Sequence, residues 1–363
     1  MKVVIRADAS IQIGTGHVMR CLTLAEGLKD KSTQVEFICR EHEGNMIDYI
    51  ENRGFKVHAI PVLKKDTGIP LPSNLEVKNI LEHGDWLGST QEQDAEICHL
   101  ILDKLVTDWL IVDHYSLDRV WQMKLHDSFQ KLMVIDDLAD RNHVCDLLLD
   151  QTYGRDTYDY KSLVPSRCRV LAGSKYALLR PEFPEWREYS LLRRENPDFK
   201  KILITMGGVD RQNITEIVLE ELRNCDLPTE MVAIIVMGVT SPYIESVRRK
   251  IKSLPFKAEI KSNVTNMAEL MANSDVAIGA SGATTWERCC LGLPSIQITV
   301  AQNQTVIADY ISKAGAALIV TVDQLNQLKS RIIILKRQIK DMAKKSAEVT
   351  DGSGLIQVLR YLK

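Results

Sequence analysis

The chain has 363 residues, with 46 basic and 48 acidic side chains and a formal net charge of -2. This length is enough for two domains of ordinary size, each with its own core. Because the two signs nearly balance and no long block of like charge occurs, neither nucleic acid nor a membrane is expected as a partner. No apolar run approaches the length of a membrane span, and Met1 leads directly into an expected strand, so the sequence predicts a soluble cytoplasmic protein.

The eight cysteines are scattered through apolar segments, and no Cys-x-x-Cys pair occurs among them. We interpret them as buried, reduced thiols. A zinc site is not expected, because no histidines stand at ligand spacing from them.

The N-terminal stretch predicts a strand, a glycine turn and a helix. Residues 2–7 form a short β-branched run, Gly14 and Gly16 follow, and apolar residues then recur at helical spacing from 18 to 28. His17 stands at the start of this helix, where unpaired backbone donors and the helix dipole favour an anion. The dipole favours a neutral imidazole suited to general-base catalysis, whereas a bound diphosphate would act in the opposite direction. The alternative is a helix-start residue that bonds only its own turn.

Met19 stands where the dinucleotide-binding fingerprint requires its third glycine. A dehydrogenase that uses a nicotinamide or flavin is therefore disfavoured, and no cofactor is expected.

The first half continues with expected strands at 34–39, 56–62, 109–115, 131–137, 145–151 and 169–172, with helices expected at 45–53 and 94–105. Alternating strands and helices predict a parallel sheet. Residues 63–90 interrupt the alternation, and long insertions of this kind are usually functional or mobile. Trp86, Gln91 and Asp94 are therefore either substrate contacts or surface-loop residues.

Polar residues follow two of the buried strands. Asp113, His114 and Tyr115 end one of them, and ligands of parallel sheets collect at such ends. The alternative is that Asp113 caps the next helix and His114 satisfies a backbone group. The Asp and His residues between 136 and 150 resemble a metal site only loosely, because aspartates at strand ends more often cap helices and turns.

The opening pattern returns in the second half. Charged, aperiodic residues at about 187–198 indicate a linker, after which a strand at 201–206 leads into the glycines Gly207 and Gly208 and a helix from Asn213. Further strands are expected at 231–237, 258–260, 276–278 and 295–298. The sequence therefore predicts a second sheet of the same type, with a cleft between the two domains. Helices expected at 329–345 and 353–363 have the character of solvated outer faces.

Residues 278–294 predict a second site, built as strand, small-residue turn and helix. Residues 281–285 offer backbone N–H groups and hydroxyls with little bulk, as close approach of a phosphate requires. Glu287 falls in the first helical turn, where its carboxylate could accept from both ribose hydroxyls or simply complement the helix dipole. Residues 302–304 follow the next strand as a polar loop.

These motifs together resemble one known family. The run from Arg6 through Asp8 and His17 to Arg20, the segments 113–115 and 135–141, Met206 to Gly208 and Gly282 to Glu287 look like the UDP-sugar hydrolase of pseudaminic acid biosynthesis, the PseG family. The resemblance covers nearly the whole chain. It implies the GT-B fold, an α/β architecture of two Rossmann-like domains facing a cleft.

The resemblance also implies hydrolysis of UDP-2,4-diacetamido-2,4,6-trideoxy-β-L-altrose to UDP and the free sugar, as in the glycosylation of flagellin or surface glycans. It implies His17 as the essential base, Tyr115 as an active-site residue, and no metal. From the residues we add Asp8 and His114 as groups that orient His17 or the sugar. The expected substrate-binding residues are Arg6, Gly14, Gly16, Arg20, Gly207, Gly208, Ser281, Gly282, Ala283, Thr284, Thr285, Glu287, Gln302 and Asn303.

The expected domains are 1–185 for the sugar and 200–345 for UDP, joined by a linker at 186–199 and followed by a helix at 346–363. The expected partner is a small-molecule UDP-sugar, with no nucleic acid, membrane or obligate protein partner. Three alternatives remain open: a UDP-sugar glycosyltransferase, a UDP-sugar epimerase, and a nucleotide-sugar binding protein without catalysis.

Overall fold

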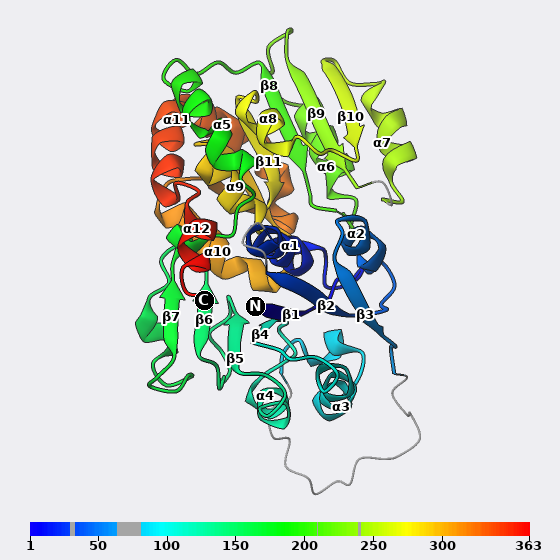
Figure 1. The fold of residues 1–363 in the computed structure, drawn as a ribbon. Coiled ribbons are helices and arrows are strands. Elements are labelled where there is room, and N and C mark those ends of the chain that lie inside the picture. Colours follow the sequence, from blue (N-terminus) through cyan, green and yellow to red (C-terminus); the bar gives the residue numbers. More distant parts are fainter. Residues whose placement is uncertain (30–32, 64–80, 209, 239–240) are drawn as a thin grey trace, which may run out of the picture. The chain divides into compact units, whose positions relative to one another are not determined.

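The structure is a computed structural model that describes residues 1–29, 33–63, 81–208, 210–238 and 241–363. The chain divides into two compact units. Unit 1 contains residues 1–151, 155–176 and 356–363, and unit 2 contains residues 152–154 and 177–355. Figure 1 shows that each unit has a central sheet with helices packed against it.

The described residues of unit 1 form a seven-stranded sheet in the order β3-β2-β1-β4-β5-β6-β7, and every pairing is parallel. Its strands are β1 (Lys2–Ala7), β2 (Gln34–Arg40), β3 (Lys56–Ile60), β4 (Trp109–Asp113), β5 (Lys131–Ile135), β6 (Leu147–Asp150) and β7 (Arg169–Ala172). Its helices are α1 (Gly16–Lys29), α2 (Ile47–Asn52), α3 (Gln91–Leu102) and α4 (Arg119–Lys124). Short 3₁₀ turns are η1 (Gly84–Leu87), η2 (Thr157–Tyr160) and η3 (Ser174–Tyr176).

The central strands of unit 1 are apolar because helices cover both faces of the sheet. Ile5 of β1 pairs with Phe37 of β2 on one side and with Ile111 of β4 on the other, and all three are fully buried. This rigid centre fixes the residues that follow β1 and β4.

The described residues of unit 2 form a six-stranded parallel sheet in the order β10-β9-β8-β11-β12-β13. Its strands are β8 (Lys201–Thr205), β9 (Val232–Met237), β10 (Lys257–Ser262), β11 (Val276–Ala280), β12 (Ser295–Thr299) and β13 (Leu318–Thr321). Its helices are α5 (Glu182–Arg193), α6 (Ile214–Arg223), α7 (Ile244–Ile251), α8 (Met267–Ala272), α9 (Thr284–Cys290), α10 (Thr305–Lys313), α11 (Leu328–Val349) and α12 (Gly354–Leu359), with η4 (Gln302–Gln304) and η5 (Val322–Gln327). Helix α12 runs from unit 2 into unit 1 at residue 356.

The predicted α/β class with two parallel sheets is confirmed. In both sheets the strand order reverses beside the first strand of the sheet. The reversal lies between β1 and β4 in unit 1 and between β8 and β11 in unit 2. In a sheet of this kind the carboxyl ends on either side of that point form a crevice that takes ligands. Each unit therefore has one position where functional residues are expected to gather.

The segment expected as a linker differs in the structure. Residues 182–193 form helix α5, which buries Phe183 and Ser190 in unit 2, and the unit boundary lies at 176–177. Three arginines of the stretch that suggested a linker are buried or half-buried and donate to backbone carbonyls of unit 2: Arg187 to Ala347, Arg193 to Ser274 and Arg194 to Met271. Likewise α11 continues to Val349, and the segment after it buries Val358, Leu359 and Leu362 rather than presenting a solvated face.

Two cysteines that are remote in sequence lie together in unit 1. Cys145 and Cys168 precede the neighbouring strands β6 and β7, and their Sγ atoms are 3.5 Å apart. All eight cysteines are free thiols, as predicted, and six of them are buried.

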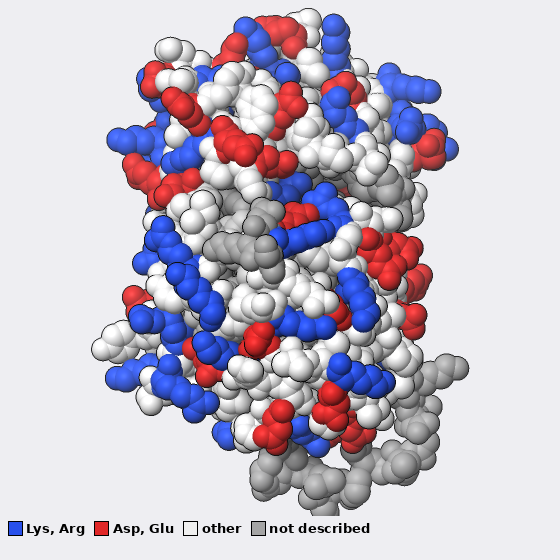
Figure 2. Space-filling view, viewed as in Figure 1, with Lys and Arg blue, Asp and Glu red and all other residues white. Residues whose placement is uncertain are grey.

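In the part of the chain that the structure describes, no helix is both long and apolar enough to span a membrane. The face drawn in Figure 2 carries basic and acidic side chains interspersed. Residues 64–80 of the insertion expected at 63–90, and Val209 beside Gly208, lie outside the described residues.

Candidate functional site

The crevice of unit 1 brings His17 next to Asp113. His17 is the second residue of α1, which follows β1, and Asp113 is the last residue of β4. The Nδ1 atom of His17 lies 2.6 Å from Oδ1 of Asp113. The exposed fraction of the side chain is 8% for His17 and 0% for Asp113. The two residues therefore form a nearly enclosed imidazole–carboxylate pair.

Arg20 holds this carboxylate in place. Its Nε and Nη2 atoms donate to the two carboxylate oxygens of Asp113 at 2.6 and 2.7 Å. Burial would raise the pKa of Asp113, but the Arg20 guanidinium and His17 outweigh this and hold that pKa well below its usual range. Asp113 is therefore ionised and can only accept hydrogen bonds.

An accepting carboxylate fixes the tautomer of His17. Nδ1 must carry the hydrogen that points at Asp113, which leaves Nε2 with a free lone pair. Within the described part of the chain, Nε2 has no hydrogen-bond partner. This arrangement can accept a proton at Nε2 while Asp113 stabilises the resulting imidazolium, which is the geometry of a general base.

Tyr115 adjoins this pair and is tied to the same arginine. Its ring meets that of His17 edge to face at a centroid distance of 4.5 Å. Its hydroxyl donates to Oδ2 of Asp137 at 2.9 Å, and Arg20 Nη1 donates to the same oxygen at 2.5 Å. Burial and Asp137 raise the pKa of Tyr115 well above its usual value. Tyr115 therefore keeps its proton, and its oxygen is free to accept from a ligand.

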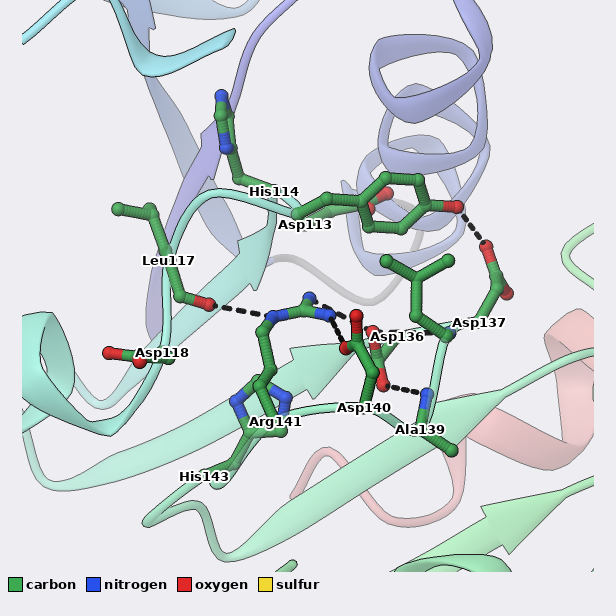
Figure 3. A network of polar contacts seen from close by, with 12 residues as sticks. Asp113, His114, Leu117, Asp118, Asp136, Asp137, Ala139, Asp140, Arg141 and His143 are labelled. Atoms are coloured by element: carbon green, nitrogen blue, oxygen red, sulfur yellow. Dashed lines mark hydrogen bonds and ion pairs between the residues drawn. The ribbon is translucent and has the colours of Figure 1, made fainter. Parts of the chain in front are cut away.

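Figure 3 shows the network that holds Asp136, the residue before Asp137. Arg141 pairs with Asp136 at 2.9 Å and donates to the Leu117 carbonyl oxygen at 3.2 Å. Asp136 also accepts from the backbone N–H of Ala139 at 3.0 Å. Asp136, one of the aspartates that loosely resembled a metal site, is thus paired with an arginine. Among the described residues, no three metal-ligating side chains are grouped so that they could hold an ion.

A second buried network lies beside the first, and it contains Arg6 and Asp8. Arg6 donates to Asp8 at 2.5 Å and to Asp94 at 2.8 Å, and all three side chains are fully buried. His114 Nε2 lies 3.3 Å from Asp8, whereas its Nδ1 accepts from the Ser116 backbone N–H. Asp8 and His114 therefore pair with each other, and neither is hydrogen-bonded to His17.

Three of the expected contacts of unit 1 are thus enclosed. Arg6, Arg20 and Asp94 have exposed fractions of 0%, 7% and 0%, and each is engaged by buried charges. We infer that these three residues stabilise the carboxyl edge of the sheet through buried ion pairs and do not contact a ligand. By contrast, a Cβ atom added at Gly14 or Gly16 would meet nothing within 4 Å, so the turn before His17 borders open space.

The crevice of unit 2 begins with the exposed glycines Gly207 and Gly208, which follow β8. Gly207 has a φ of +87°, in the left-handed region that favours glycine. The neighbouring Gly238 is also required, because a Cβ there would stand 2.0 Å from the Gly208 carbonyl oxygen. Asp210 then caps α6 by accepting from the N–H groups of Ile214 and Thr215. The turn is thus tightly packed but open at its tip.

The small-residue turn after β11 is the other side of this crevice. Among the described residues, the backbone N–H groups of Gly282, Ala283 and Thr284 have no acceptor. The Ser281 hydroxyl is buried without a hydrogen-bond partner, whereas the Thr285 hydroxyl is fully buried and donates to Gln297. The Ser281 N–H donates to the Ile298 carbonyl oxygen. The Ser281 N–H and the Thr285 hydroxyl are therefore engaged within unit 2 and do not point at a ligand. The free donors can receive an anion.

Glu287 lies in the first turn of α9 with an exposed fraction of 18%. Burial raises its pKa to about 7, and Arg180, which lies 3.9 Å away, opposes this. The next residue, Arg288, is fully buried and donates to the Ala280 carbonyl oxygen at 2.8 Å. Gln302 is exposed and Asn303 is half-buried, and both lie in η4. Glu287 therefore titrates near neutral pH.

Sequence reasoning missed Asp137 as the partner of Tyr115, and it missed Arg180 beside Glu287. It placed Asp113 at a strand end without pairing it to His17. The sequence signal was that Asp136 and Asp137 come after a buried apolar run, as Asp113 ends one. The pairings span 96 residues for His17 and Asp113 and 22 for Tyr115 and Asp137, so no local spacing reveals them.

Residues 201–355 match the glycosyltransferase family 28 C-terminal domain. Among individual relatives, the UDP-2,4-diacetamido-2,4,6-trideoxy-beta-L-altropyranose hydrolase of Campylobacter jejuni is 28% identical over 87% of this chain and 97% of its own. The spore coat polysaccharide biosynthesis protein SpsG of Bacillus subtilis is 27% identical over 100% of this chain and 98% of its own. The uncharacterized protein MJ1062 of Methanocaldococcus jannaschii is 27% identical over 92% of this chain, which spans 62% of that protein.

Among solved structures, MurG of Acinetobacter baumannii is similar with a TM-score of 0.69, at 16% identity over 99% of this chain and 98% of its own. The order of both sheets and this likeness show the GT-B fold, with two Rossmann-like domains.

Proposed function

We propose that this protein hydrolyses a UDP-sugar and releases UDP. The observation that carries the proposal is the pairing of His17 Nδ1 with the buried, ionised Asp113, which leaves Nε2 able to accept a proton. The similarity to the Campylobacter jejuni hydrolase over most of both chains supports the choice of substrate class. The match of residues 201–355 to a glycosyltransferase domain supports nucleotide-sugar chemistry in general.

In the proposed reaction, unit 2 binds the nucleotide and unit 1 acts on the sugar. The free N–H groups of residues 282–284 bind phosphate oxygens, and Glu287 accepts from the ribose hydroxyls. Gly207, Gly208, Gln302 and Asn303 are proposed to complete that part of the site. The finer proposal for the sugar is 2,4-diacetamido-2,4,6-trideoxy-L-altrose.

The proposed chemistry needs one base and one stabilised leaving group. His17 Nε2 takes a proton from a water molecule whose oxygen attacks the anomeric carbon. The bond from that carbon to the diphosphate oxygen breaks, its electron pair leaves with UDP, and the configuration at carbon inverts. Asp113 stabilises the imidazolium, and backbone donors near the phosphates take up the developing charge. The Tyr115 oxygen and the turn at Gly14 and Gly16 border the sugar.

The test is incubation with the UDP-diacetamido sugar in oxygen-18 water, with chelator present and no acceptor. Label on the free sugar, corrected for anomeric exchange, is expected, and label on the UDP phosphate would instead mean attack at phosphorus. His17→Ala should lower turnover by about 100- to 10,000-fold, the usual contribution of a general base. If His17→Ala stays within a few-fold of the natural protein, the proposal for His17 is wrong.

A glycosyltransferase is the second candidate, and one observation favours it: the family 28 match is to a glycosyltransferase domain. This candidate predicts release of UDP only when an acceptor is added. Acceptor-independent turnover in the labelling experiment would exclude it.

A further inference from the structure

Two partly buried rings that the proposed reaction does not use stand against Tyr115 in unit 1. His83 is the N-cap residue of η1 and Trp86 lies within it, and their ring centroids are 4.3 Å apart at an interplanar angle of 34°. Both rings lie over Tyr115, at centroid distances of 5.5 Å for His83 and 5.9 Å for Trp86. Tyr115 in turn touches His17 at 4.5 Å. The ring pair is thus one side chain away from the proposed base.

The segment that carries these rings is fixed to the sheet edge. Leu87 is 1% exposed and packs in the core of unit 1. The Ser116 hydroxyl donates to the His83 carbonyl oxygen at 2.5 Å, and the Gly88 carbonyl oxygen accepts from the Leu63 N–H at 3.1 Å. The position of the ring pair is therefore set before any ligand binds, which lowers the entropy cost of binding.

This ring pair is aromatic, uncharged and partly open. His83 and Trp86 are both half-buried, so part of each ring stays open. Burial lowers the pKa of His83, which keeps its imidazole neutral near pH 7. Arg141 lies over Tyr115 with its guanidinium carbon 5.7 Å from the ring centroid. The faces of His83 and Trp86 suit the C–H and methyl groups of a ligand whose polar atoms point elsewhere.

We propose that Trp86 and His83 form the subsite that reads the apolar groups of the sugar, its methyl and acetamido methyl groups. This inference rests on the proposed function, because it places the sugar at His17. The occupant is a sugar rather than a protein segment, since the ring pair adjoins the proposed base. One methyl or methylene read by an apolar pocket gives about 10- to 200-fold discrimination.

The test compares two sugars in two variants of Trp86. For Trp86→Leu, kcat/KM for the UDP-diacetamido-trideoxy sugar should fall by about 10- to 100-fold. For UDP-N-acetylglucosamine, which has a hydroxymethyl group and one acetamido group, kcat/KM should change by less than about threefold. Trp86→Phe should retain most of the selectivity because an aromatic face remains. The affinity for UDP alone should not change in either variant, and loss of UDP binding would overturn the assignment.

Trp186→Leu is the matched control. Trp186 is also a half-buried tryptophan with an aromatic neighbour, Tyr189 at 5.3 Å, but it lies in α5 of unit 2. Trp186→Leu should leave unchanged the ratio of kcat/KM for the UDP-diacetamido sugar to kcat/KM for UDP-N-acetylglucosamine. An equal loss for both sugars in Trp86→Leu, or an unchanged ratio, would overturn the subsite.

Failure of the proposed function is visible separately. If the natural protein releases UDP from neither sugar, hydrolysis is wrong, and the subsite is then tested by binding alone. The dissociation constants of both UDP-sugars relative to UDP are measured for the natural protein and Trp86→Leu. A preference for the diacetamido sugar that disappears in the variant supports the subsite, and identical values in both proteins overturn it.

Discussion

Asp113 is the residue on which the chemistry of His17 depends. Asp113→Asn keeps the shape of the side chain but allows its amide to donate to Nδ1, which favours the unproductive tautomer of His17. We expect kcat for UDP release to fall by about 100- to 10,000-fold with little change in KM. Steady-state kinetics of UDP release measures this.

Asp137→Asn is the matched control, because Asp137 also binds Arg20 but makes no contact with His17. It should cost much less in kcat than Asp113→Asn. Equal losses in the two variants would contradict the tautomer argument and point to a general effect of the Arg20 network.

Glu287 should make both nucleotide binding and stability depend on pH. Its pKa is raised to about 7 in the folded chain, whereas an unfolded glutamate titrates near 4.5. Between these values the folded state binds more protons, so the free energy of unfolding falls as the pH rises, by roughly 3 kcal/mol in all. Urea unfolding at pH 5 and pH 8 should show this fall in the natural protein and a smaller one in Glu287→Gln.

The ionised form of Glu287 is the one that accepts from ribose hydroxyls. UDP affinity should therefore strengthen as the pH rises through 7 in the natural protein and show less pH dependence in Glu287→Gln. Calorimetric titration with UDP measures this, and parallel pH profiles in the two proteins would remove Glu287 from the nucleotide site.

At the scale of the element, helix α6 depends on a capping bond that its own N-cap residue does not supply. Asn213 makes no capping bond, and Asp210 instead accepts from Ile214 and Thr215 at 2.8 and 3.0 Å. Asp210→Ala should lower the free energy of unfolding by about 1–2 kcal/mol, whereas Asp210→Asn should retain most of it. Hydrogen exchange of the first-turn amides of α6 measures the loss locally.

Asp118→Ala is the control, because Asp118 caps α4 in unit 1 in the same way. It should speed exchange in α4 and leave α6 unchanged. Uniform acceleration in both helices would mean that the effect is global rather than a lost cap.

Helices and strands could be predicted where the local residue pattern determines them. Contacts between side chains that are remote in sequence could not. The run of apolar residues at β1 identifies a buried strand, but it cannot show that Arg6 within it meets Asp94, 88 residues away. Arg6 was expected to bind substrate and Asp8 to orient His17 or the sugar, whereas in the structure the two side chains pair with each other. Helix α5 was missed because five of its twelve residues are charged and only Phe183 and Ser190 are buried, so no apolar periodicity marks it.

At the scale of the whole molecule, the last residues belong to the unit that the first residues begin. Residues 356–363 are part of unit 1, where Gln357 donates to the Lys175 carbonyl oxygen and Arg169 lies over the Tyr361 ring. Deleting 356–363 removes Val358, Leu359 and Leu362, which are 0–5% exposed. At about 1.5–3 kcal/mol for each side chain, unit 1 should lose roughly 4–9 kcal/mol.

Hydrogen exchange across the whole chain checks this prediction. Protection should fall in β7 and its neighbours in unit 1 and stay unchanged in the strands of unit 2. Ile356→Ser is the control, since Ile356 is 62% exposed and should have little effect. Equal loss of protection in both units would contradict the assignment of this segment to unit 1.

The return of the chain to unit 1 also sets the order in which the protein is made. During synthesis residues 1–151 and 155–176 emerge from the ribosome first. All of 177–355 follows, and the segment 356–363 of unit 1 comes after it. Unit 2 is therefore fully translated while unit 1 still lacks its last segment. The unit that holds His17 therefore receives its segment 356–363 only after all of 177–355 has been made.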